Sequence, residues 1–314
     1  MNRLPERFAD KFKEILGSDF SRLEQSYNEK PSKGLWANSH KIASGKLKEK
    51  LELKGWKLEQ LEFNENAFRL AKSPDRPGLT GEFEYGLFNL QDIAAMVPAV
   101  LLNPEEGASV LDCCAAPGTK TLQLSTMMKG TGHITAFDEE RKRYKALKTV
   151  VIKFGAKNVN AIHQSFLSTP EGRKFKFILL DAPCSGEGFA VKMHEAMKAW
   201  SPAAVKRKSE LQKRMILRAF DLLETGGKLV YSVCTMSPEE CEEVVQRLVE
   251  KRPEAELVKL EIKGLAYSEG LRQYNGKDFS GIAGNCMRIW PWQNNTQGFF
   301  IAVIGKKSFQ ADSY

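Results

Sequence analysis

Two cysteines in this chain have neighbours that are typical of a reaction site. Cys184 stands in the segment DAPCSG, three residues after Asp181, and Cys234 stands in the segment YSVCTMSP. Each segment directly follows a run of apolar residues that predicts a β-strand. A thiol with a pKa of ~8.5 is only slightly ionised at neutral pH, so a nucleophilic cysteine needs a helix N-terminus, a lysine or its substrate to stabilise the thiolate.

One cysteine at a strand end is usually a packing residue, but two on neighbouring loops favour a shared site. We therefore expect Cys184 and Cys234 to converge over one crevice. The chain has 6 cysteines and 4 histidines, with no CxxC pair among them. This composition argues against a zinc site, so we expect free thiols and no metal.

A third segment, VLDCCAAPGTKT at residues 110–121, is rich in small residues. Gly118 lets a ligand approach the backbone just before a helix, whose first amides have no partners within the helix. The dinucleotide pattern GxGxxG and the phosphate-binding pattern GxxxxGK[ST] are both absent from the sequence, so neither NAD nor ATP is favoured. Asp138 ends the next apolar run, where an acid can accept hydrogen bonds from a ribose, and Arg143 follows it.

Short apolar runs alternate with helical patterns from residue 108 onward, which predicts a doubly wound α/β domain with a parallel sheet. The expected strands are Ser109–Cys113, His133–Phe137, Val159–His163, Phe177–Asp181, Lys228–Val233 and Phe299–Ile304. The expected helices are Lys120–Met128, Glu139–Phe154, Pro202–Leu223 and Pro238–Lys251. Ser237 and Glu240 predict a capping box at the start of the last helix. In such sheets ligands bind beyond the carboxyl ends of the strands, where all these segments lie.

Residues 1–72 predict a small α+β module, with amphipathic helices followed by strands at Trp56–Glu62 and Ala67–Leu70. The segment 72–81 holds two prolines and two glycines, and we place a domain boundary there, with an N-terminal module at residues 1–76 and a catalytic domain at residues 77–314. The net charge of +8 permits a nucleic-acid partner without proving one.

Several side chains are candidates for RNA contacts. Trp36, Lys41 and Lys46 suit base stacking and phosphate binding, although Trp36 is at least as well explained as a core residue. Lys192 and Lys198 are candidates to line an RNA path beside the Cys184 loop.

The sequence contains no candidate membrane span. The longest apolar run, Ile93–Leu102, has ten residues and includes Pro98, whereas a spanning helix needs ~20 apolar residues. The N-terminus lacks the apolar core of a signal peptide, which predicts a cytoplasmic protein. No extra apolar stripe is evident, so we expect a monomer.

The ordered motifs VLDCCAAPGTKT, AFDEERKR, DAPCSGEG, LVYSVCTMSPEE and GFFIAVIGK resemble those of the RNA 5-methylcytosine methyltransferases of the RsmB/RsmF (Nop/Sun) family. The resemblance covers roughly residues 82–306, and KGLWANSHKI resembles the family's RNA-contacting extension. It implies the class I S-adenosylmethionine (SAM) methyltransferase fold, a Rossmann-like, mostly parallel seven-stranded sheet with a small N-terminal α+β module.

The resemblance also implies roles for individual residues. Cys234 would be the nucleophile, Cys184 would assist release of the methylated base, and Asp181 would be the acid near the cytosine ring. The implied SAM-binding residues are Cys114, Ala115, Ala116, Pro117, Gly118, Thr119, Lys120, Asp138, Arg143, Ser165 and Asp181. The implied partner is structured RNA, either tRNA or rRNA.

Four positions depart from the family pattern: Val233, Cys241, Ser165 and Trp292. None of these positions supplies a core chemical group, so they put the rate and the SAM affinity in doubt rather than the reaction.

Two alternatives remain open. In a DNA cytosine-5 methyltransferase Cys184 would be the nucleophile, and an RNA-binding assembly factor that has lost catalysis would have negligible SAM affinity. A covalent adduct between protein and nucleic acid, tested with a variant of each cysteine, distinguishes the RNA enzyme from the DNA enzyme. SAM binding distinguishes the enzyme from the assembly factor.

Overall fold

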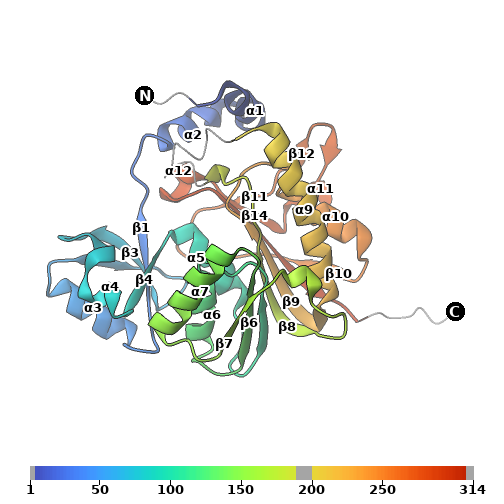
Figure 1. Cartoon of the computed structure of the whole chain (residues 1–314). Helices are drawn as coiled ribbons and strands as arrows, with labels where there is room; N and C mark the ends of the chain where they lie inside the picture. Colours follow the sequence, from blue (N-terminus) through green and yellow to red (C-terminus); the bar gives the residue numbers. More distant parts are fainter. Residues whose placement is uncertain (1–3, 189–199, 309–314) are drawn as a thin grey trace.

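The computed structural model describes residues 4–188 and 200–308 and is built around a large, mostly parallel sheet (Figure 1). Among the described residues this sheet has nine strands, in the order β11-β14-β15-β9-β8-β5-β6-β7, with β10 paired to β15. The strands are β5 (Ser109–Asp112), β6 (His133–Asp138), β7 (Val159–His163), β8 (Phe175–Asp181), β9 (Leu223–Val233), β10 (Ala255–Val258), β11 (Ser268–Glu269), β14 (Cys286–Ile289) and β15 (Phe299–Lys306).

Helices cover both faces of this sheet, as the alternating pattern predicts. One face packs against α5 (Ile93–Leu102), α6 (Thr119–Met127) and α7 (Arg141–Phe154). The other face packs against α9 (Pro202–Asp221) and α10 (Glu242–Lys251). Neighbouring residues of one strand serve opposite faces: Val110 is buried with α5, and Leu111 is buried with α9 and α10.

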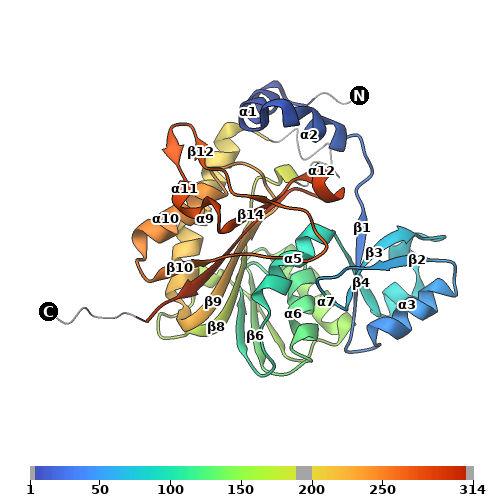
Figure 2. The same ribbon diagram turned by 180° about the vertical axis from the view of Figure 1, so that it is seen from behind.

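All six predicted strands of the α/β domain are confirmed. Three further strands of the main sheet, one long helix and the short elements between residues 273 and 294 are missed. β10 and β11 are short edge strands, and β14 is a short strand between β11 and β15. β10 and β14, both labelled in Figure 2, pair with β15, which runs antiparallel to β9. The missed helix, α5, is apolar on nearly all sides because it is buried against the sheet, so its sequence shows no amphipathic period. The side chain of Asp92 caps its first turn.

The predicted capping box before α10 is wrong. The helix begins at Glu242 rather than Pro238, and residues 238–241 form turns. The Ser237 hydroxyl and the Glu240 carboxylate, which would form the box, instead bind the Glu187 carboxylate and the Ser185 backbone N–H. Tertiary partners thus replace the local cap.

The N-terminal part contains a small antiparallel sheet in the order β2-β3-β1-β4. Its elements are β1 (Lys33–Ala37), α3 (Ser44–Glu52), β2 (Lys57–Gln60), β3 (Ala67–Lys72), α4 (Gly81–Glu84) and β4 (Phe88–Gln91). The strands predicted near residues 56–62 and 67–70 are confirmed. The boundary predicted at residues 76/77 stays a prediction, and the small sheet extends past it through β4.

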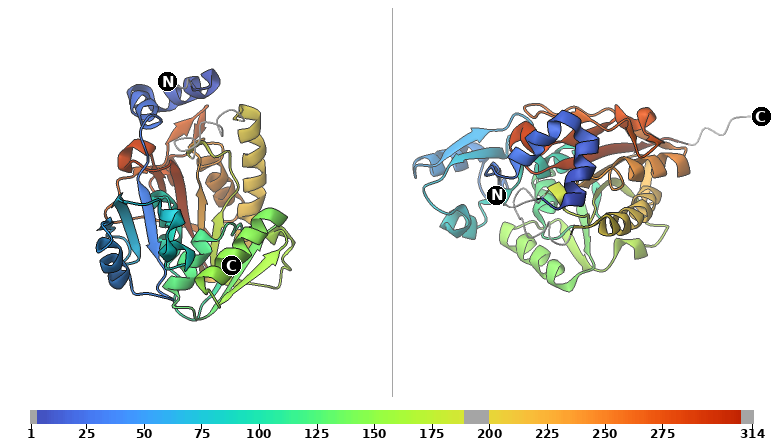
Figure 3. Two further views of the ribbon diagram at one scale, coloured as in Figure 1. Left: turned by 60° about the vertical axis from the view of Figure 1, so that its left-hand side comes forward. Right: turned by 90° about the horizontal axis from the view of Figure 1, so that it is seen from above.

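Helices α1 (Glu6–Leu16) and α2 (Phe20–Ser26) lie apart from this small sheet. Figure 3 shows them across one end of the main sheet, and Phe8 and Phe12 pack with Trp200, Met236 and Trp290 there. The apolar faces of α1 and α2 are therefore buried against the larger domain rather than against the small sheet.

Three short elements complete the C-terminal part. They are the β12 (Gln273–Tyr274) and β13 (Lys277–Asp278) hairpin, α11 (Ser280–Ala283) and α12 (Pro291–Asn294). No helix in residues 4–188 and 200–308 is long and apolar enough to cross a membrane.

Candidate functional site

The two cysteines predicted to converge lie in direct contact. The Sγ atoms of Cys184 and Cys234 are 3.2 Å apart. The contact arises because β8 and β9 are parallel neighbours, with Asp181 opposite Ser232, so that the loops after both strands leave the same edge of the sheet. Both side chains are half-buried, whereas Val233 and Thr235, which flank Cys234, are fully buried.

The contact between the two thiols affects the ionisation of Cys184. The hydrogen bond to Cys234, followed by burial, raises the pKa of the Cys184 thiol well above its usual value. Either sulfur can be the donor in this hydrogen bond, because each thiol carries one S–H and one acceptor sulfur.

Asp181 lies at the end of β8 and is held by two donors. Lys120 Nζ lies 2.6 Å from Asp181 Oδ2, and the Ser232 hydroxyl donates to Asp181 Oδ1 over 2.8 Å. Lys120 comes from the first turn of α6, so this ion pair joins the small-residue loop to the cysteine-bearing strands. Only 11% of the lysine side chain and 27% of the aspartate side chain are exposed, which limits screening by water.

The small-residue loop from Cys114 to Lys120 connects β5 to α6. Ala115 N–H donates to the Phe137 carbonyl over 2.8 Å, which fixes the loop against β6. Gly118 has φ +110°, and a Cβ there would lie 3.0 Å from the side chain of Val150, so the sequence needs glycine at this position. No side chain caps the first amides of α6, whose residues are all described.

Asp138 and Arg143 also reach this loop. Arg143 Nη2 lies 3.2 Å from Asp138 Oδ2 and donates to the Ala116 carbonyl over 3.0 Å. Ser165 lies after β7 at the same edge of the sheet, directly before a 3₁₀ turn at Phe166–Ser168. The predicted cofactor residues thus gather along one edge.

Three buried acids near the site were not among the predicted site residues. Asp112 accepts from the Thr121 hydroxyl over 2.7 Å, and burial raises its pKa to about 7. Glu187 and Glu240 are both 0% exposed and bind the cysteine-bearing loops. Glu187 lies in the motif DAPCSGEG and Glu240 in the segment SPEE. The sequence around an acid does not show whether the folded chain buries it.

The structure corrects one predicted RNA contact, that of Trp36. Trp36 is 0% exposed, and its indole N–H donates to the Thr126 hydroxyl over 3.1 Å, so it is a core residue. Lys41 is exposed and donates to the carbonyls of Tyr85 and Lys153, the second of which lies near the end of α7. Lys46 is exposed on α3, and both lysines stay predicted RNA contacts. Lys192 and Lys198 lie outside the described residues.

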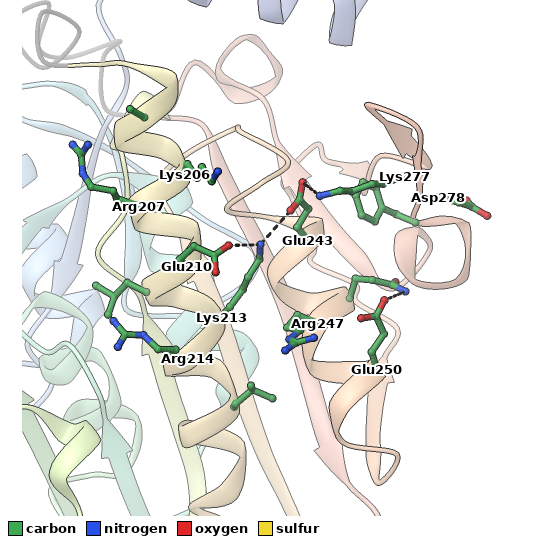
Figure 4. Close-up of a pocket in the computed structure, with 15 residues that line it drawn as sticks. Lys206, Arg207, Glu210, Lys213, Arg214, Glu243, Arg247, Glu250, Lys277 and Asp278 are labelled. Atoms are coloured by element: carbon green, nitrogen blue, oxygen red, sulfur yellow. Dashed lines mark hydrogen bonds and ion pairs between the residues drawn. The ribbon is translucent and has the colours of Figure 1, made fainter.

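A groove of about 1160 Å³ lies away from this edge, between α9 and α10 (Figure 4). Its charges are mixed and largely neutralise each other; Lys213, for example, lies 3.0 Å from Glu210 and 3.3 Å from Glu243. None of the predicted site residues lines it. Within the described ranges no group of three or more His, Cys, Asp or Glu side chains could hold a metal ion, and the absence of a metal stays a prediction.

Comparisons with known proteins fit this arrangement. A family model described as 16S rRNA methyltransferase RsmB/F matches residues 99–305, and a model of the N-terminal domain of 16S rRNA methyltransferase RsmF matches residues 4–93. A tRNA (cytosine(49)-C(5))-methyltransferase of Pyrococcus abyssi is 34% identical over 95% of this chain and 99% of its own length.

Longer relatives match as well. The ribosomal RNA small subunit methyltransferase F of Vibrio parahaemolyticus is 33% identical over 96% of this chain, and the chain spans 63% of the length of that relative. A solved methyltransferase homolog from Pyrococcus horikoshii superposes with a TM-score of 0.87 at 31% identity, covering 97% of this chain and 95% of its own. This likeness confirms the predicted methyltransferase fold. Because the RsmB/F model matches more than half of the residues, the chain belongs to the RsmB/F methyltransferase family.

Proposed function

We propose that the protein is a SAM-dependent RNA methyltransferase that forms 5-methylcytosine in tRNA or rRNA through a covalent cysteine–cytosine intermediate. The observation that carries this proposal is the 3.2 Å contact between Cys184 and Cys234 at the strand edge that also holds Asp181. The relatives named above support it, since their names describe methylation of rRNA and of tRNA cytosine.

The chemistry accounts for each of the three groups. Carbon 5 of cytosine is a poor nucleophile until a thiolate adds to carbon 6 and makes the ring an enamine. We assign that addition to Cys234. Negative charge develops at ring nitrogen 3 during the addition, and we assign the proton that neutralises it to the pair of Asp181 and Lys120, whose charged groups lie 2.6 Å apart.

Release of the product needs a further group. After carbon 5 gains the methyl group, it must lose its proton, and the bond from carbon 6 to sulfur must break. Cys184 in its thiolate form, or a water beside it, is the candidate to accept that proton, because its sulfur touches the sulfur that forms the thioether.

We infer that SAM occupies the edge beside α6, where it supplies the electrophilic methyl group. The residues present fit this cofactor in two respects. The uncapped amides at the start of α6 suit its carboxylate, and the Asp138 carboxylate at the end of β6 suits its ribose hydroxyls. The remaining predicted residues, from Cys114 to Lys120 with Arg143, Ser165 and Asp181, line the same edge.

The proposed partner is structured RNA, and α7 offers a surface for its phosphates. Six of the fourteen residues of this helix are basic and none is acidic. Lys142, Lys145 and Lys148 are exposed along it. Near its C-terminal end, the ring of Tyr85 is 74% exposed, which suits stacking with an unpaired base.

The decisive experiment is methyl transfer from labelled SAM to unmodified tRNA and rRNA, with 5-methylcytosine identified by mass spectrometry. We expect activity in the wild type, no transfer and no adduct with Cys234→Ala, and a protein–RNA adduct that accumulates on gels with Cys184→Ala. The opposite assignment of the cysteines, on a DNA substrate, would support a DNA methyltransferase. An absence of SAM binding would support the inactive assembly factor. We also propose that the protein is a monomer in the cytoplasm.

A further inference from the structure

One buried carboxylate binds the segment that follows the Cys234 thiol. Glu187 accepts hydrogen bonds from the Thr235 hydroxyl (2.8 Å), the Met236 N–H (3.1 Å) and the Ser237 hydroxyl. The Trp200 indole N–H adds a fourth donor at 2.6 Å. Three consecutive residues after Cys234 therefore depend on one side chain from the Cys184 loop.

The backbones of the two loops are in contact at the same place. The N–H of Gly188, next to Glu187, donates to the carbonyl of Cys234 over 3.0 Å. A Cβ on Gly188 would lie 2.0 Å from the Gly298 carbonyl oxygen, so only glycine allows this approach. Glu187 is thus fixed directly beside the residue that carries the thiol.

A second carboxylate makes the reverse connection. Glu240, which lies downstream of Cys234, accepts from the backbone N–H of Ser185, next to Cys184, over 3.0 Å. Gln212 of α9 donates to Glu240 over 2.8 Å and to the Pro183 carbonyl over 3.0 Å. Each cysteine-bearing loop therefore holds the other through a buried acid.

The Met236 peptide is bound at both ends. Its N–H donates to Glu187, and its carbonyl accepts from Arg288 Nη1 over 2.8 Å. Arg288 is 2% exposed and paired with the fully buried Glu242. Burying an acid costs free energy unless its oxygens are satisfied, and an apolar side chain would fill the position of Glu187 without that cost. The four bonds of Glu187 therefore indicate a role in geometry.

We infer that Glu187 is a positioning residue for Cys234, which with Glu240 sets the distance between the two thiols. This inference rests on the proposed function only for its catalytic consequence; the distance itself can be measured without RNA. Glu187→Gln keeps the shape but replaces one acceptor oxygen by an N–H₂ group that faces donors, so at least part of the four-bond set is lost. The loop after Cys234 should then move away from Cys184.

The test uses the full-length protein and disulfide formation as a probe of distance. Diamide, an azo oxidant, takes up the two electrons and two protons released when the two thiols join. A variant with serine at Cys113, Cys114, Cys241 and Cys286 removes competing thiols, and mass spectrometry after digestion identifies the bridge. We expect Glu187→Gln to slow bridge formation about tenfold or more relative to the same background with Glu187 intact.

A matched control is Glu261→Gln, which makes the same chemical change at an exposed position and should leave the rate unchanged. Thr235→Val provides a second, milder variant, because it removes one of the four donors while keeping the volume. It should slow the bridge less than Glu187→Gln does, and the melting temperature verifies that each variant is folded. If background thiol substitution prevents folding, the same rates are measured by mass spectrometry on the protein with all its cysteines.

Catalysis gives an independent readout. With methyl transfer as the assay, Glu187→Gln should lower kcat about 10- to 100-fold with little change in the KM for SAM, and Glu187→Asp should restore part of the loss. An unchanged bridging rate in a folded Glu187→Gln protein overturns the inference. A slowed bridge in a protein whose wild type methylates no RNA keeps the inference about geometry and rejects the proposed function.

Discussion

Lys120 Nζ and Asp181 Oδ2 lie 2.6 Å apart, although the two residues are 61 positions apart in the chain. The pair joins the loop proposed for the cofactor to the loop proposed for the target base. In the proposed reaction this charged contact connects the two substrate sites, so its loss should lower the rate of the chemical step.

We expect Lys120→Met to reduce methyl transfer about 10²- to 10³-fold, because a preorganised positive charge is lost beside the base. The measurement is kcat at saturating SAM and RNA. Lys213→Met is a matched control, since Lys213 is also a partly buried, ion-paired lysine but lies in the α9–α10 groove. Equal activity of both variants would contradict the assignment of Lys120.

Trp36→Phe should destabilise the protein without weakening RNA binding. The substitution removes the hydrogen bond from the indole to Thr126 and part of a fully buried ring, at a cost of about 1–3 kcal/mol in the free energy of unfolding. Urea denaturation measures the loss, and a filter-binding assay measures the RNA affinity. A selective loss of RNA affinity would instead return Trp36 to the RNA interface.

Replacing Lys142, Lys145 and Lys148 of α7 together by alanine should weaken RNA binding at all sequences. If each lysine binds one phosphate, the slope of log affinity against log salt should fall by about 2–3. A control replaces the exposed Lys251, Lys259 and Lys263, which lie elsewhere on the surface, and should leave the slope near its wild-type value. An unchanged slope in the α7 variant would place the RNA on another face.

Glu240 predicts a pH dependence of stability. Burial, followed by the nearby Glu187, raises the pKa of Glu240 from 4.5 to about 7. Between pH 4.5 and about pH 7, Glu240 is therefore protonated in the folded protein and ionised in the unfolded chain. The free energy of unfolding falls as the pH rises through this window. Glu240→Gln removes this titration and should reduce the loss between pH 5 and pH 8 by about 2 kcal/mol.

Denaturation curves of both proteins at the two pH values measure this difference. Asp112, whose pKa is also about 7, titrates in the same window in both proteins, so its contribution cancels in the comparison. A wild type and variant with the same pH dependence would show that Glu240 stays ionised in the folded protein.

The sequence alone determined the α/β architecture and the residues along its functional edge. Apolar runs with flanking helices located the strands that end at Asp112, Asp138, Asp181 and Val233, because burial on both faces leaves a pattern that needs no long-range information. Loops that follow neighbouring parallel strands leave the same edge of the sheet. The sequence alone therefore predicts that Cys184 and Cys234 lie close together.

Other features depend on partners that are distant in the chain. Residues 237–240 resemble a helix start, yet Ser237 and Glu240 bind acceptors and donors near residue 185, and α10 begins later. Trp36 lies in a basic segment, yet its ring is buried. The local sequence shows which side chains can form hydrogen bonds. The partners that they bind depend on all the groups that the folded chain brings near them.

The tertiary structure alone decided the precise environment of the two thiols. Motifs identify Cys184, Cys234 and Asp181, but hydrogen bonds act over about 3 Å, and only the folded chain shows which groups approach so closely. The placement of Lys120 against Asp181 and of Glu187 beneath the Cys234 loop follows from the packing of α6 and of the strand ends, and no short segment of sequence records it.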